Sequence, residues 1–119
     1  MRIFIICPVR GITEEEQSAI ETYTRNMESE GHRVHWPPRD TNQEDSVGYR
    51  ICADNYNAII DADEIHVWWN INSQGSLFDL GMAFALQKKI HLINRDSIKA
   101  TETKSFTNVL LYLHDMRHV

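Results

Sequence analysis

The sequence is poor in cysteine and has no excess of positive charge, and both shortages exclude classes of protein. Its 119 residues include two cysteines, Cys7 and Cys52, which are too few for a disulfide-stabilised scaffold. Because no C-x-x-C pair occurs either, a reducing compartment is expected, and we predict a cytoplasmic protein. Twelve Lys and Arg stand against seventeen Asp and Glu. The resulting net charge of −5 argues against binding to a nucleic-acid backbone.

Long apolar runs are missing as well. No run approaches the roughly 20 residues of a membrane-spanning helix, so we expect no contact with a membrane. The apolar run within residues 1–7 has only about five residues and meets Pro8 at once, which predicts a buried strand instead of a signal peptide. With 42% hydrophobic and 24% charged residues, the composition is that of a single globular domain over residues 1–119.

Common fingerprints of cofactor and metal sites are also absent. The chain has neither the lysine of a phosphate-binding P-loop nor a G-x-G-x-x-G turn, and its six histidines form no H-E-x-x-H pair. We therefore expect no structural zinc ion, and the enzymatic function considered below would need neither a metal ion nor an organic cofactor.

Apolar runs with strand-like composition alternate along the chain with segments of helical periodicity. Thr13 and Glu16 form a capping-box pattern at one helix start, and Gly31 is the expected stop of that helix. The expected strands are 2–7, 33–36, 65–69 and 90–93; the expected helices are 13–30, 46–61, 77–87 and 106–113, with a loop at 39–45 and a turn at 72–75. Strict alternation predicts an α/β fold, a flavodoxin- or Rossmann-like three-layer sandwich with a parallel sheet of four or five strands.

Ligands of such sheets bind beyond the carboxyl ends of the strands. This rule nominates the four segments that follow the expected strands, which are residues 7–11, 37–40, 70–79 and 94–96. In the first segment, Arg10 could hold a phosphate or carboxylate through its planar fork of donors. Gly11 would let the backbone approach a ligand closely. The competing interpretation is a plain strand-to-helix turn with a solvated arginine.

The segment from Ser73 to Gly81 enters a helix directly after a buried strand. Free amides at a helix start, together with serine hydroxyls, form a natural anion site, and Asp79 is expected in the first turn beside it. The alternative is that Ser76 caps the helix and Asp79 closes a capping box. Both interpretations can hold together.

Acidic and aromatic residues near the third expected strand allow two further expectations. Asp54, Asp61, Asp63 and Glu64 lie close together in sequence, and we interpret Asp61 as a solvated turn residue. Trp68 and Trp69 end the strand at the ligand edge, so we expect one in the core and the other free to stack on a base or sugar.

Three blocks of the sequence resemble the nucleoside 2-deoxyribosyltransferase superfamily, which includes the 2-deoxynucleoside 5-phosphate N-hydrolases. The similarity runs from Arg2 to about Asn94, and its third block is the most specific. The blocks are IFIICPVRG (3–11), NYNAIIDADEIHV (55–67) and SQGSLFDLGMAFALQKKIHLIN (73–94).

The resemblance implies cleavage of an N-glycosidic bond, or deoxyribosyl transfer, on a nucleoside or its 5-monophosphate. Asp79 matches the carboxylate that attacks the anomeric carbon. Ser73 matches the position that contacts the 5-hydroxyl or 5-phosphate, and together with Arg10 it favours a phosphorylated ligand. The resemblance also implies a homodimer or larger homo-oligomer in which a neighbour completes the pocket. The candidate substrate-binding residues are Cys7, Arg10, Gly11, Asp54, Asn55, Ser73, Gly75 and Ser76.

Two positions depart from the family pattern. The nucleophile is usually Glu, and Asp79 is shorter by one methylene, or roughly 1.5 Å. The family also places an Asp about two turns before the Ala62-Asp63 turn, where this sequence has Asn55 with Asp54 beside it. These departures favour an alternative, a non-catalytic nucleotide-binding or sensing module of the same fold. A third possibility is an orphan flavodoxin-like domain with an unrelated partner.

Overall fold

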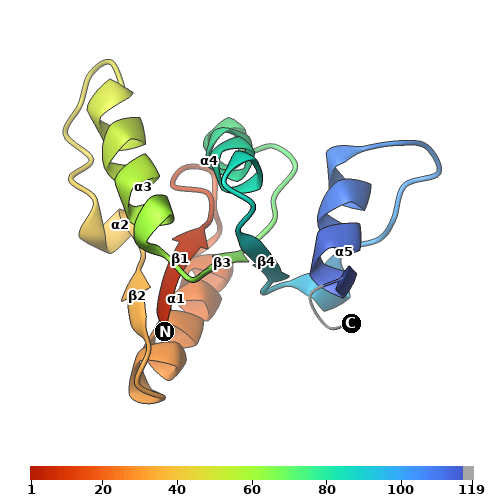
Figure 1. Ribbon diagram of the computed structural model, residues 1–119, viewed down its shortest axis with the longest axis horizontal. Coiled ribbons are helices and arrows are strands. Elements are labelled where there is room, and N and C mark those ends of the chain that lie inside the picture. The colour runs from red at the N-terminus through yellow and green to blue at the C-terminus, as the bar shows by residue number, and fades with distance from the viewer. Residues whose placement is uncertain (117–119) are drawn as a thin grey trace.

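The computed structural model describes residues 1–116, which form alternating strands and helices (Figure 1). The strands are β1 (Arg2–Ile6), β2 (Arg33–His35), β3 (Glu64–Val67) and β4 (Lys89–Leu92). The helices are α1 (Glu14–Ser29), α2 (Pro37–Asp40), α3 (Tyr49–Asp61), α4 (Gln74–Ala85) and α5 (Phe106–Met116), with a 3-10 turn at Arg95–Ser97. Within this part of the chain, no helix is both long and apolar enough to cross a membrane.

The four strands form one parallel sheet in the order β2-β1-β3-β4. The chain leaves β1 for a neighbour on one side and then returns to β3 on the other side. The strand order therefore reverses between β1 and β3, and it is beyond the carboxyl ends of such a pair that ligands bind. The predicted α/β fold with a parallel sheet is confirmed.

Alternate residues of the strands fill two separate cores, because successive side chains point to opposite faces. Phe4 and Ile6 pack on one face with apolar residues of α3 and α4. Ile3 and Ile5 pack on the other face with Ile20 of α1. Helix α5 lies beyond β4 at the end of the sheet (Figure 1). The layers are those of the predicted sandwich.

The ends of α1 agree with the sequence signals. The hydroxyl oxygen of Thr13 accepts a hydrogen bond from the Glu16 amide at 3.1 Å, and the Glu16 carboxylate accepts one from the Thr13 amide at 3.4 Å, which is the expected capping box. Gly31 lies just beyond the helix with φ of 96°, a conformation that favours glycine.

The expected loop over 39–45 is partly wrong, because its first residues complete the one-turn helix α2. Proline fixes the φ that a first helical turn needs, and Pro37 and Pro38 occupy the first two positions of α2. Asp40 then closes the turn by accepting a hydrogen bond from the Trp36 amide at 2.9 Å. This turn matters for the site, because it places Thr41 close to the end of β2.

Candidate active site

A cleft of about 470 Å³ opens at the carboxyl edge of the sheet, at the strand-order reversal. The loop after β1, the middle of α3 and the first turns of α4 line it. The predicted site residues that it brings together are Cys7, Arg10, Asn55, Ser73, Gly75 and Asp79.

Three other predicted site residues lie outside this cleft. Gly11 adopts a positive φ of 68° in the turn after Arg10, so the conformation of the turn is what favours glycine here. Asp54 points to Arg50 one helical turn away, and their side chains form an ion pair of 2.6 Å at the surface. Ser76 is buried, and its hydroxyl accepts a hydrogen bond from that of Ser73 at 2.8 Å. Their contacts with a ligand stay predictions.

Helix α4 begins at Gln74, earlier than predicted, because Ser73 and not Ser76 is its N-cap. The Ser73 hydroxyl oxygen accepts the Ser76 amide at 3.2 Å. Either serine is a favourable cap, so the local sequence left the choice open. The expected turn at 72–75 is therefore only partly right, because the turn lies at 71–72 and the helix already includes Gln74 and Gly75. Asp79 falls in the second helical turn, where it has no capping role. Asp79 lines the cleft instead.

The environment of Asp79 favours a reactive carboxyl group. Burial raises the pKa of Asp79 to about 7, although a hydrogen bond from Asn55 opposes this change. The Asn55 amide nitrogen donates to the Asp79 carboxylate at 3.4 Å, a long contact. Burial, with the negative charge of Asp79 adding to it, raises the pKa of the neighbouring Cys7 thiol to about 12. Cys7 is therefore a neutral neighbour, and Asp79 titrates close to neutrality.

Arg10 and the start of α4 favour the binding of an anion in the cleft. Arg10 is exposed on the loop after β1, and the first turn of α4 brings Ser73, Gln74 and Gly75 to the same cleft. The first amides of a helix have no partner within it, and a guanidinium can bind two oxygens of one phosphate. The cleft thus combines a carboxyl group with donors suited to a phosphate.

Two residues at the site had no sequence signal. Thr41 is buried after α2, and its hydroxyl donates to the Asn55 side-chain oxygen at 2.9 Å. Gln43 lines the cleft and donates to the carbonyl oxygens of Pro37 and Thr41 at 3.0 and 3.2 Å. Both come from the expected polar loop, where threonine and glutamine carry no catalytic motif.

The expected stacking role of a tryptophan is not supported by the structure. Trp69 is in the core, as expected for one of the pair, and its indole N–H donates to Thr107 at 3.1 Å. Trp68 packs with α1 on the opposite face, and its indole N–H donates to Glu16 at 3.1 Å. The aromatic side chain in the cleft is instead Phe78, which is largely exposed.

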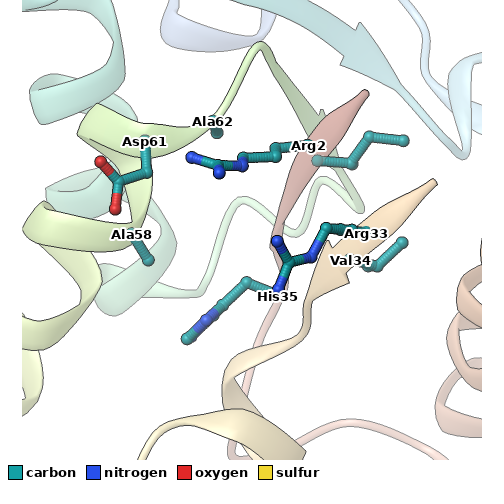
Figure 2. A pocket seen from close by; sticks show the side chains of 8 residues that line it. Arg2, Arg33, Val34, His35, Ala58, Asp61 and Ala62 are labelled. Atoms are coloured by element: carbon teal, nitrogen blue, oxygen red, sulfur yellow. The ribbon is translucent and has the colours of Figure 1, made fainter.

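A second hollow, of about 360 Å³, lies at the amino edge of the sheet (Figure 2). Arg2 and Arg33 are directly paired on β1 and β2, and Asp61 lies at the end of α3. Asp61 is exposed, as expected of a solvated residue. Its neighbour Asp63 accepts the Arg2 amide at 2.8 Å, a structural contact. These acidic residues are therefore separate from the cleft at Asp79.

Metal ligation finds no support among residues 1–116, where no group of three or more His, Cys, Asp or Glu side chains is arranged to hold an ion. Cys7 and Cys52 are both free thiols.

No family model and no curated protein matches the sequence, but solved structures do. A 2-deoxyribosyltransferase from the psychrotolerant bacterium Bacillus psychrosaccharolyticus superposes with a TM-score of 0.65 at 20% identity, covering 92% of this chain and 90% of that one. The CMP N-glycosidase BcmB of Clostridium botulinum superposes with a TM-score of 0.58 at 22% identity, covering 77% and 70%. The chain has the nucleoside 2-deoxyribosyltransferase-like fold. At these identities the likeness establishes this fold alone.

Proposed function

We propose that this chain cleaves the N-glycosidic bond of a nucleoside or deoxynucleoside 5-monophosphate, or transfers its sugar, with Asp79 as the nucleophile. The observation that carries the proposal is the position of Asp79 in a cleft that also contains Arg10 and Ser73. Two neighbours of the same fold, named as a CMP N-glycosidase and a 2-deoxyribosyltransferase, support a nucleoside or nucleotide substrate.

The reaction would proceed by double displacement. The ionised Asp79 attacks the anomeric carbon, the bond from that carbon to the base breaks, and the base departs with the bonding electron pair and gains a proton. Water then attacks the glycosyl ester, which frees the sugar and regenerates the carboxylate; attack by a second base would give transfer. A pKa of about 7 leaves roughly half of Asp79 ionised at neutral pH.

Substrate positioning would fall to Arg10 and the start of α4. The guanidinium and the free amides after Ser73 would bind the 5-phosphate, which attaches to the sugar that Asp79 attacks. The exposed ring of Phe78 offers a flat apolar surface for the base.

The second candidate function is a nucleotide sensor without catalysis. This candidate is favoured by the long contact between Asn55 and Asp79. It is also favoured by the amide of Asn55, which stands where the family has a carboxylic acid. Both functions predict nucleotide binding, but only the first predicts the appearance of free base.

The test is incubation with a panel of nucleoside and deoxynucleoside 5-monophosphates, with free base measured by chromatography. We expect release by the wild type and a loss of about 10³-fold or more in Asp79→Asn, since a neutral amide cannot form the ester. Asp115→Asn makes the same chemical change at an exposed residue of α5 and should leave the rate unchanged. Saturable binding without release would overturn the enzyme in favour of the sensor, and release by Asp79→Asn would overturn the nucleophile.

We further propose that the chain forms a homodimer through an apolar groove between α4 and α5, of about 480 Å³. Two aromatic side chains that line the groove, Phe84 and Phe106, are 61% and 68% exposed, and Val109 beside them is 45% exposed. A second copy would cover the exposed parts of these side chains together with the apolar residues around them, and a stable interface covers roughly 800 Å² per partner. Asp79 is the sole charged residue of α4, which is typical of a buried helix.

A second copy on this groove would lie beside the cleft, because α4 borders both. Sedimentation should show a dimer for the wild type and a monomer for Phe84→Glu, which buries a charge in the interface. Val47→Glu, at an exposed apolar residue of the loop before α3, is the matched control and should remain a dimer. A monomeric wild type, or a dimeric Phe84→Glu, would contradict this interface.

A further inference from the structure

A line of hydrogen bonds leads from the end of β2 to Asp79. The ring nitrogen Nε2 of His35 lies 2.8 Å from the Thr41 hydroxyl oxygen. The Thr41 hydroxyl donates to Asn55 Oδ1 at 2.9 Å, and Asn55 Nδ2 donates to Asp79 at 3.4 Å. Four side chains from four separate parts of the chain therefore form one continuous path.

Each group in this path donates a hydrogen bond to the next group in the direction of Asp79. Because Asn55 Oδ1 accepts the Thr41 hydroxyl, the amide nitrogen of Asn55 is the atom that faces the carboxylate. Thr41 has a single hydroxyl proton and gives it to Asn55, so its oxygen accepts the proton on His35 Nε2. An ionised Asp79 thus requires the His35 tautomer that carries its proton on Nε2.

The middle of the path is shielded from water, since Thr41 is 5% and Asn55 6% exposed. Buried polar groups without alternative partners are held to the hydrogen bonds that the protein supplies. Burial also lowers the pKa of His35, so the ring stays neutral at neutral pH and can take either tautomer.

Other charged groups face the two ends of the path. Asp40, Arg39 and Asp54 act on His35 electrostatically. His35 also lines the hollow of Figure 2, together with Arg2 and Arg33.

At the other end, the thiols of Cys7 and Cys52 lie near Asp79, and Arg10 shares its cleft. None of these groups is part of the hydrogen-bonded path.

We propose that Thr41 and His35 are positioning residues, which orient the Asn55 amide so that it stabilises Asp79 as the ionised nucleophile. This inference rests on the proposed function for its catalytic consequence. When Asp79 is protonated, its O–H needs an acceptor, and the path reverses. Asn55 then turns its oxygen to Asp79 and its nitrogen to Thr41, and Thr41 donates to an unprotonated His35 Nε2.

Thr41→Val tests the path, because valine has the shape of threonine but no hydroxyl. Without its orienting partner, the Asn55 amide stabilises the carboxylate less, so Asp79 should titrate at higher pH by about half a unit or more. Carboxyl carbon NMR of Asp79 measures the titration directly, and the acidic limb of kcat/KM should move with it. Thr41→Ser restores the hydroxyl and should restore both values.

Thr24→Val is the matched control, since Thr24 is equally buried but its hydroxyl donates to the Ile20 carbonyl oxygen in α1. It should leave the Asp79 titration unchanged. His35→Phe is a second way to break the path, because its ring can keep the stacked contact with Phe4, at 5.2 Å between centroids, while losing the N–H donor. It should move the titration in the same direction.

The proposal is overturned if Asp79 titrates as in the wild type in both Thr41→Val and His35→Phe, or if Thr24→Val or Thr41→Ser shifts it as much as Thr41→Val. The NMR titration needs no turnover. A shift in Thr41→Val without base release by any variant would therefore sustain the path and refute the catalytic function.

Discussion

Two buried polar networks lie on opposite sides of the sheet, and they differ in where they end. On the α1 side, the Tyr23 hydroxyl bonds to His66 Nδ1 at 2.6 Å, and His66 Nε2 bonds to Glu64 at 3.0 Å. The ring of His91 lies between those of His66 and His114, with centroids 4.8 and 4.9 Å apart. His114 Nδ1 then accepts the amide of Leu92 in β4 at 2.9 Å. On the α3 side, the path from His35 ends at Asp79.

The histidine row joins structural elements to one another. It links α1 to the sheet through Tyr23, and α5 to the outer edge of β4 through His114. The Asp79 path ends instead on a carboxyl group that borders a cleft and holds one long hydrogen bond. Buried polarity by itself therefore does not mark a functional site. What indicates a functional site is a network that ends on an ionisable side chain whose charged form the protein stabilises poorly.

The two networks should respond to mutation with changes of opposite sign in the free energy of unfolding, and the largest change is expected at Asp79. Asp79→Asn should increase the free energy of unfolding at pH 8 by roughly 2–4 kcal/mol, because the native state no longer holds a poorly solvated carboxylate. The folded pKa of Asp79, about 7, lies above that of an unfolded aspartate, near 4. The wild type should thus lose stability as the pH rises from about 4 to about 7, and then level off.

Urea unfolding at pH 4 and pH 8 measures this difference. The two proteins should be nearly equal at pH 4, where Asp79 is protonated in the folded wild type and about half protonated in the unfolded chain. A lower stability of Asp79→Asn at pH 8 would show that the carboxylate stabilises the fold, and the contrast between the networks would disappear.

A smaller effect of opposite sign is expected in the histidine row. His114→Leu should decrease the free energy of unfolding by about 1–3 kcal/mol, because the buried amide of Leu92 loses its acceptor. His114→Asn offers an oxygen to the same amide and should recover part of the loss. Thermal unfolding measures both variants. Base release should be unchanged, and a loss of activity without a loss of stability would place this network in the reaction.

The smallest effect is expected for Tyr23→Phe, which deletes one hydroxyl at the α1 end of the row. The variant should lose about 1 kcal/mol of stability, the usual contribution of one hydrogen bond. Its pH–rate profile should match that of the wild type, in contrast to Thr41→Val. A shifted profile in Tyr23→Phe would mean that the two networks are coupled through the sheet.

Local patterns in the sequence predicted most of the fold. The capping box at Thr13 and the stop at Gly31 are complete within a few residues, so the ends of α1 were predictable. The alternation of strands and helices predicted the parallel sheet. The rule that ligands bind beyond strand ends then placed Cys7, Arg10, Ser73 and Asp79 at one edge, where the cleft lies.

Choices between adjacent candidates were less predictable. Asp54 and Asn55 are neighbours on α3, and only the orientation of the helix in the fold directs Asn55 to Asp79. It leaves Asp54 at the surface, where Asp54 pairs with Arg50 of the same helix. The same holds for Trp68, which the sheet directs toward α1 and away from the cleft. Residues one apart on a helix or strand point in different directions, so a small uncertainty in an element's rotation exchanges their roles.

The sequence by itself determined the α/β class, the resemblance to deoxyribosyltransferases and the nomination of Asp79, because periodicity and motif spacing are local properties. Only the tertiary structure decided which serine caps α4, that Thr41 and His35 are connected to Asp79, and that burial raises the pKa of its carboxyl group. These outcomes depend on contacts between distant segments and on the exclusion of water, which arise when the layers of the fold pack together.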